Sequence, residues 1–187
     1  MDTREAADAG PGELVFRDAA AEDTAAVIDL VHAAYRGTGA PGGWTTEADI
    51  LGGQRTDPQE IRDLLADTGG RLLLVERDGV LTACCRVEHR GTRGYFGLFA
   101  VRPDLQGGGV GRAVLAEAER IAAGWGAREM EMTVIVQRED LIAWYERRGY
   151  RRTGRTIPFP YGDARFGLPR RDDLRFAELV KPLAPPS

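Results

Sequence analysis

A glycine-rich turn near the middle of the chain constrains the fold more than any other segment. Residues 106–111 read Gln-Gly-Gly-Gly-Val-Gly, between a strand pattern that ends at Val101 and a helical pattern that begins at Val110. Consecutive N–H groups in such a turn form a concave anion site, and the helix N-terminus adds the positive end of its dipole. Glycine is favoured because a Cβ would hold a phosphate away from the backbone. The turn therefore predicts a site for a phosphate or a pyrophosphate.

Two common phosphate-binding motifs do not fit this turn. A Walker A loop requires Gly-Lys followed by Ser or Thr, whereas Gly111 is followed by Arg112 and Ala113. A dinucleotide fingerprint that starts at Gly109 has Val114 where the third small residue belongs, and the turn does not follow the first strand. A glycine-rich connector without a ligand stays an alternative on the turn alone, because isolated glycine motifs are weak evidence.

Hydrophobic periodicity predicts strands and helices that form a single α/β domain. Strands are expected at 14–17, 71–77, 80–89, 95–101, 129–136, 150–157 and 174–180, and helices from 18 or 21 to 35, from 58 to the glycines at 69 and 70, and over 110–123 and 139–148. Asp78-Gly79 predicts a hairpin. Residues 44–55 are ambiguous and residues 158–169 are expected to form a long loop. We expect a disordered tail over residues 1–12 and one domain over residues 13–183.

Charge and cysteine content exclude several functional classes. A formal charge of −4 gives no overall attraction to nucleic acid or to anionic membranes. The N-terminus lacks the apolar region of a signal peptide, and no segment approaches the roughly 18 apolar residues of a membrane span. Cys84 and Cys85 are neighbours, a spacing that does not suit a disulfide. We therefore expect a reduced, cytoplasmic protein without a metal, and no nucleic acid or membrane as partner.

Residues 95–153 resemble the GNAT superfamily of acetyl-CoA-dependent N-acetyltransferases. The turn matches that family's Gln/Arg-x-x-Gly-x-Gly/Ala motif, and Val-x-Pro at 101–103 precedes it as in the family. Met-Glu-Met-Thr-Val at 130–134 resembles the family's fifth strand, and residues 143–150 resemble the helix end Tyr-x-x-x-Gly-Phe/Tyr. The flanking segments agree in the order of their elements alone.

The resemblance implies a fold class and a co-substrate. The fold is α/β, an α+β mixed sheet in a GNAT-like three-layer arrangement, with helices on both faces and a splay between strands 95–101 and 129–136. Acetyl-CoA would lie in the splay, and its pantetheine would add to the open strand edge. The residues implied to bind it are Phe99, Ala100, Val101, Gln106, Gly107, Gly108, Gly109, Val110, Gly111, Arg112 and Arg138. Arg138 stands where the family often has Asn.

The resemblance also suggests catalytic residues. Tyr145 matches the family's tyrosine that hydrogen-bonds the departing thiolate. Many relatives carry a glutamate base at the position of Gly97, so the base must come from elsewhere. Glu131 is the first candidate because strand alternation could aim it into the splay, while Glu88, His89 and a chain of waters stay open. The missing carboxylate also leaves open a non-catalytic CoA-binding or sensory module.

Two segments are expected, by analogy of fold, to shape the acceptor site. Residues 36–55 offer Trp44 and Glu47, and residues 158–173 offer Tyr161. Aromatic rings and carboxylates suit a cationic amine, although the same residues could instead anchor long loops. We therefore predict acetyl transfer to a primary amine in a ternary complex, with a small-molecule acceptor rather than a protein. Transfer of a larger acyl group is an alternative, the acceptor stays unidentified, and a homodimer is possible.

Overall fold

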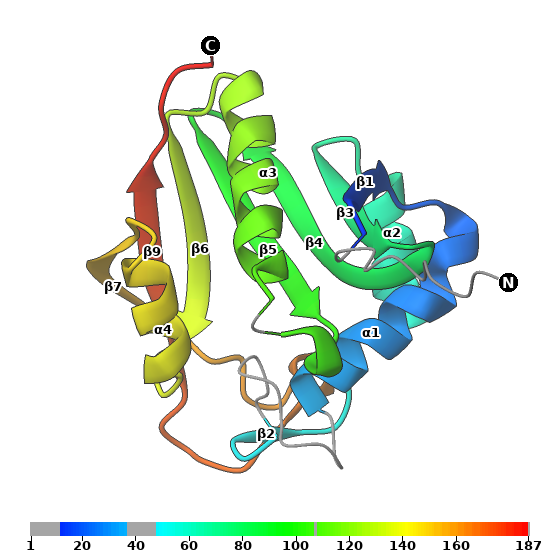
Figure 1. Ribbon diagram of the computed structural model, residues 1–187. Coiled ribbons are helices and arrows are strands. Elements are labelled where there is room, and N and C mark those ends of the chain that lie inside the picture. Colours follow the sequence, from blue (N-terminus) through cyan, green and yellow to red (C-terminus); the bar gives the residue numbers. More distant parts are fainter. Residues whose placement is uncertain (1–11, 37–47, 107, 187) are drawn as a thin grey trace, which may run out of the picture.

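The computed structural model describes residues 12–36, 48–106 and 108–186. Its main sheet has seven strands, in the order β1-β3-β4-β5-β6-β9-β7 (Figure 1). These strands are β1 (Leu14–Asp18), β3 (Gly70–Arg77), β4 (Val80–Arg90), β5 (Arg93–Val101), β6 (Glu129–Ile135), β7 (Arg151–Pro158) and β9 (Arg175–Pro182). The helices are α1 (Thr24–Arg36), α2 (Pro58–Ala66), α3 (Val110–Gly124) and α4 (Glu139–Glu146). Short 3-10 helices lie at Ala21–Asp23, Pro103–Leu105 and Ala164–Phe166.

Strands β5 and β6 are the parallel neighbours in an otherwise antiparallel sheet, and they pair only briefly. Their register covers three residue pairs, from Arg93 opposite Glu129 to Tyr95 opposite Glu131, and then the strands diverge. On the other edge of β5, the register with β4 shifts after Cys84, and Leu98 has a φ of 45°. A bulge of this kind bends its strand and increases the local twist. The predicted splay is confirmed, and it lies beside this bulge.

Helices cover both faces of the sheet, as the predicted three-layer fold requires. Helices α3 and α4 pack on one face over the larger apolar core, and α3 crosses the front of β4 and β5 in Figure 1. Helices α1 and α2 pack over β3, β4 and β5 on the opposite face. Because side chains alternate along a strand, Cys84 lies in the α1/α2 core and Cys85 in the α3/α4 core.

A third, smaller apolar cluster covers β6 and β9 on the α1/α2 face. Strand β2 (Leu51–Gly52) pairs with β8 (Leu168–Pro169) in a separate two-stranded sheet. Leu51, Ile135, Phe159 and Leu174 form this cluster, with Phe176 packed against it. Segments far apart in the sequence therefore cover the part of this sheet face that α1 and α2 do not cover. The sequence predicted a loop at 158–169 and no pairing with residue 51, because this contact is non-local.

Local signals predicted several element boundaries correctly. The hairpin is confirmed, since Asp78 and Gly79 have φ values of 53° and 74°. Pro58 is the first residue of α2, and the Asp57 side chain caps the helix by accepting a hydrogen bond of 2.8 Å from the Glu60 N–H. No helix among the described residues is long and apolar enough to cross a bilayer. Residues 1–11 of the predicted tail lie outside the described residues.

The close packing of α3 on the sheet generates a stability prediction at Gly94. A Cβ on Gly94 would lie 2.6 Å from the Cβ of Ala122, so Gly94→Ala forces α3 outward. We expect the free energy of unfolding to fall by about 1–3 kcal/mol, the usual cost of overpacking. Urea unfolding followed by circular dichroism measures this change. Gly124→Ala is the control, because a Cβ there meets nothing within 4 Å. Equal stability of the two variants would contradict the packing described here.

Candidate active site

A cavity of about 530 Å³ lies where β5 and β6 diverge. Its lining includes Phe99 and Tyr145, which belong to the α3/α4 core. It also includes Tyr95, Thr133 and Phe176, which alternation places on the opposite face of their strands. The cavity therefore passes between the strands, from one face of the sheet to the other. Two reactants that approach from opposite faces can meet inside it.

Tyr145 is the phenol that α4 contributes to this cavity. Its side chain is only 4% exposed, and its ring makes edge contacts with Trp144 and Tyr150 at 5.1 and 5.7 Å between centroids. Burial raises the pKa of Tyr145 well above its ordinary value of 10, and the charge of Arg138 partly opposes that shift. The hydroxyl therefore keeps its proton at neutral pH, so Tyr145 can donate a hydrogen bond into the cavity.

Arg138 is buried at the N-terminus of α4, ahead of Tyr145. Its side chain is 8% exposed and pairs with the carboxylate of Asp140 at 3.3 Å. The electrostatic interaction of Arg138 with Tyr145 indicates that its guanidinium lies close enough to influence the cavity. The predicted contact of Arg138 with a cofactor stays a prediction, and the structure adds a positive charge near the phenol.

The glycine turn stands between the end of β5 and the start of α3. Gly109 is the N-cap of α3 with a φ of 80°, a conformation that favours glycine. At Gly108 the φ is ordinary, and a Cβ would meet only the Leu105 carbonyl at 3.7 Å. No described residue therefore requires glycine at 108, which is expected if the backbone must approach a ligand. Gly107 lies outside the described residues.

The side chains around the turn serve different purposes. The Gln106 amide donates a hydrogen bond of 2.9 Å to the Val101 carbonyl, which ties the turn to the end of β5. Val110 is buried in the core, so its backbone alone can face a ligand, whereas Gly111 is partly exposed and Arg112 is exposed. Of the predicted anion-binding side chains, Arg112 is thus the one placed in solvent beside the turn.

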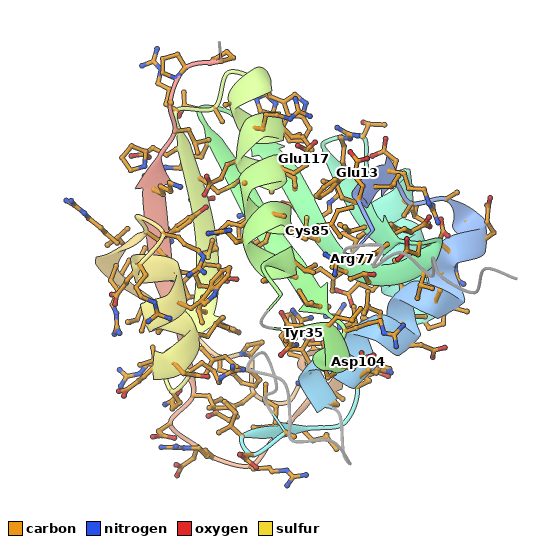
Figure 2. All side chains as sticks on the ribbon, in the orientation of Figure 1. Glu13, Tyr35, Arg77, Cys85, Asp104 and Glu117 are labelled. Carbon is orange, nitrogen blue, oxygen red and sulfur yellow. The ribbon has the colours of Figure 1, made fainter. Side chains whose placement is uncertain are left out.

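The end of β5 is held on two sides. Ala100 and Val101 pair with β4, while the Tyr35 hydroxyl of α1 donates a hydrogen bond to the Phe99 carbonyl. Figure 2 shows Tyr35 beside the lower end of β5, where the cavity begins. The edge of this segment that faces β6 lies beyond the last β5–β6 pair at Tyr95. Beyond that pair, no strand among the described residues pairs with β5 on this side, and the cofactor contacts of Phe99, Ala100 and Val101 stay a prediction.

Tyr95 is a functional candidate that the sequence did not reveal. A Cβ on Gly97 would lie 2.7 Å from the Tyr95 ring, so the ring covers the position where relatives carry a glutamate. The Tyr95 hydroxyl lies 3.3 Å from the Thr133 hydroxyl across the splay, and the Arg90 guanidinium stacks 3.7 Å above the ring. Tyr95 therefore bridges β5 and β6. The sequence could have indicated this contact, because residues two apart in a strand lie on the same face and Tyr95 is two residues from Gly97.

The structure places the candidate bases in different surroundings. Glu131 does not line the cavity, and its carboxylate accepts hydrogen bonds from Arg93 at 3.1 Å and Arg90 at 3.4 Å. Glu88 does line the cavity, with Arg90 at 2.8 Å. His89 points to the opposite face, where its ring lies 5.8 Å from Trp125. The role of Glu131 as a base stays a prediction, and the geometry favours Glu88.

Arg86 holds one wall of the cavity in place. Its residue is 2% exposed, and its guanidinium donates to the Leu64 carbonyl at 2.8 Å and to the Asp67 carboxylate. A Cβ on Gly70 would lie 2.7 Å from that guanidinium, so glycine makes room for it. Arg86 therefore ties the C-terminal end of α2 to β4, and α2 forms a wall beside Glu88.

The cysteines take no part in this site. Both are fully buried, and burial raises the pKa of the Cys84 thiol to about 12 and that of Cys85 well above its ordinary value. Neither is a thiolate at neutral pH, so neither is a nucleophile. Among the described residues, no cluster of His, Cys, Asp and Glu has the arrangement of a metal site.

Of the predicted acceptor residues, the structure describes Tyr161. Trp44 and Glu47 are outside the described residues. Tyr161 is half-exposed and does not line the cavity; its hydroxyl donates to the Arg171 carbonyl at 3.0 Å and accepts from the Leu174 N–H at 2.8 Å. Tyr161 thus anchors its loop. Its neighbour Phe159 lines the cavity instead, with 5.1 Å between the two ring centroids.

The chain belongs to the acetyltransferase (GNAT) family, whose sequence model matches residues 42–150, more than half of its length. The protein is therefore an acyltransferase. No curated protein matches the chain.

Solved N-acetyltransferases share its fold. The ribosomal-protein-alanine N-acetyltransferase from Brucella melitensis aligns with a TM-score of 0.67 at 20% identity, over 90% of this chain and 99% of that one. A chimera of the spermidine N-acetyltransferase from Vibrio cholerae aligns with a TM-score of 0.64 at 16% identity, over 90% and 95%. At these identities the similarity shows the shared fold alone. The names of the two proteins indicate different classes of acceptor.

Proposed function

We propose that the protein transfers an acetyl group from acetyl-CoA to a primary amine of a small molecule by direct attack in a ternary complex. The cavity that passes between β5 and β6 carries this proposal, because it brings Tyr145 on one face and Glu88 toward the other to a common space. Acetyl-CoA enters from the α3/α4 face and the amine from the opposite face. An amine that meets the thioester directly needs no covalent enzyme intermediate.

Acetyl-CoA fits the residues on its side of the sheet. Its diphosphate lies on the turn that contains Gly108 and Gly109, where the backbone is open to solvent and Arg112 adds a charge. Its pantetheine lies along the edge of β5 that faces β6 beyond Tyr95, next to Phe99 and Val101. A backbone N–H on that edge then polarises the thioester carbonyl, as in an oxyanion site.

The chemical step uses Glu88 and Tyr145. Glu88 accepts a proton from the ammonium, directly or through water, and the neutral nitrogen attacks the carbonyl carbon of the thioester. The C–N bond forms, the nitrogen releases its second proton to water, the C–S bond breaks, and the sulfur leaves as a thiolate that accepts a hydrogen bond from Tyr145. Glu88 supports this role because it lines the cavity, where its carboxylate pairs with Arg90 at 2.8 Å and with Arg86 at 3.8 Å, whereas Glu131, which pairs with Arg90 and Arg93, does not line the cavity.

The direct test is release of the CoA thiol from acetyl-CoA in the presence of a panel of primary amines. The buried cysteines keep the background of a thiol reagent low in this assay. Turnover with at least one amine, and a product heavier by one acetyl group in mass spectrometry, supports the proposal. Saturable CoA binding without turnover of any amine would instead favour a non-catalytic module.

A first prediction concerns the glycine turn. Gly108→Ala should raise the KM for acetyl-CoA about tenfold, because the new Cβ meets open space in the protein but keeps the diphosphate from charge-assisted backbone hydrogen bonds. The melting temperature should stay unchanged, and Gly124→Ala serves as the control for both quantities. An unaltered KM in Gly108→Ala would move the diphosphate away from this turn.

A second prediction concerns Tyr145. Tyr145→Phe should lower kcat by roughly 10- to 100-fold, the value of a hydrogen bond to a developing charge, and leave the KM for acetyl-CoA nearly constant. Because burial raises the pKa of Tyr145 far above 10, its hydroxyl stays protonated, and kcat should show no loss from its ionisation up to about pH 10. Tyr161→Phe is the control. A kcat equal to wild type in Tyr145→Phe would remove this residue from the chemistry.

A third prediction separates the two carboxylates. Glu88→Gln should lower kcat/KM about 100-fold, in the range of general base catalysis, and Glu131→Gln should change it less than about threefold. Activity is compared per folded molecule, with circular dichroism as the measure of folding. The opposite ranking would assign the proton transfer to Glu131.

A further inference from the structure

One part of the cavity has an apolar wall. Aliphatic and aromatic side chains from five segments line it: Leu51, Ile135, Ile157, Phe159, Phe166 and Phe176. Phe159 stacks on Phe176 with 5.7 Å between the ring centroids, and both pack with Leu51 and Ile135. Offset rings of this kind present a flat apolar surface to a bound molecule.

The charged side chains that line the cavity come from other segments. They are Arg55, Glu60, Arg86 and Glu88, which stand ahead of α2, on α2 and on β4. Arg86 is engaged with Leu64 and Asp67, and Glu88 with Arg90. Among the described lining residues, the carboxylates therefore come from α2 and β4, and none comes from the segments that carry Phe159 and Phe176.

This division of charge suits one kind of acceptor. When the one ammonium group of a monoamine pairs with Glu88, the rest of the acceptor faces the aromatic rings of the apolar wall. Among the described lining residues, no carboxylate stands beside Phe159 and Phe176 for a second ammonium, and burial of a charge without a carboxylate costs more than ring faces return. Burial of an aromatic or branched apolar group against these rings is favourable, by about 25 cal/mol for each Å² of apolar surface removed from water.

We propose that the acceptor is a small primary monoamine with an aromatic or bulky apolar body, of the arylalkylamine class, with its nitrogen at Glu88 and its body against Phe159, Phe166 and Phe176. This inference rests on the proposed function and names the substrate class of the same site. The cavity volume of about 530 Å³ also accommodates the thioester end of acetyl-CoA beside such a molecule.

The test compares primary amines with the full-length protein and acetyl-CoA. Phenethylamine is the probe, ethylamine lacks the ring, spermidine adds charges, and a short peptide with an N-terminal alanine represents protein acceptors. We expect kcat/KM for phenethylamine to exceed that for each of the other three at least tenfold. A tenfold ratio corresponds to about 1.4 kcal/mol, which burial of part of one ring supplies.

A variant at the apolar wall adds a second readout. Phe166 lines the cavity but is 44% exposed, so Phe166→Ala should leave the fold intact. We expect the KM for phenethylamine to rise about fivefold, because the variant loses part of the apolar contact that one aromatic side chain makes with the substrate. The KM values for ethylamine and acetyl-CoA should stay constant. Leu168→Ala is the matched control, since Leu168 is 57% exposed on the same loop and does not line the cavity.

The outcomes separate the inference from the function on which it rests. Turnover of spermidine or the peptide at a kcat/KM equal to or above that of phenethylamine overturns the acceptor class and leaves amine acetylation intact. An unchanged KM for phenethylamine in Phe166→Ala overturns the assignment of the ring wall. Absence of turnover with every amine overturns both proposals.

Discussion

The early divergence of β5 and β6 is the constraint on which the site depends. Strand β6 pairs with β9 along its whole length, from Glu129 to Ile135, and β5 pairs with β4 on its other edge. Each strand is therefore held by its outer neighbour and needs no contact with the other. Beyond Tyr95, no strand among the described residues pairs with the inner edge of β5, and the carbonyls of Phe99 and Val101 accept hydrogen bonds from the side chains of Tyr35 and Gln106. The bulge at Leu98 bends β5 beside the point where the two strands diverge.

Tyr95 determines where the divergence begins and which charges reach the cavity. Behind its ring, Arg93 pairs with Glu129 and Glu131, and Arg90 pairs with Glu131. Exposed ion pairs contribute little individually, about 0–1 kcal/mol, but these link β4, β5 and β6 at the closed end of the splay. The ring lies over Gly97 with its hydroxyl near Thr133, and Arg90 links this network to Glu88, which lines the cavity. A carboxylate at position 97 and this ring cannot occupy the same space.

The parts that the sequence predicted are those determined by local chemistry. The turn around Gly109 needs a positive φ and a following helix, and the hairpin at Asp78 needs two left-handed residues. A few consecutive residues are therefore enough to predict each of them. Tyr145 could be found because its helix carries a family pattern. The position of Tyr95 over Gly97 and the pairing of β2 with β8 depend on contacts distant in sequence, which periodicity does not encode. Glu131 faces the expected side of its strand, but the arginines that hold it come from β4 and β5.

Burial gives Tyr145 a particular chemical role in the proposed reaction. A thiol ionises near pKa 8.5, and the pKa of Tyr145 lies far above the ordinary value of 10, so complete proton transfer from this phenol to a thiolate is uphill. The same burial strengthens a hydrogen bond from the hydroxyl to a developing negative charge, because few competing dipoles surround it. The buried charge of Arg138 acts in the same direction, since it stabilises an anion in the cavity. The sulfur therefore leaves as a stabilised thiolate and takes its proton afterwards from solvent, while Tyr145 remains a donor throughout the cycle.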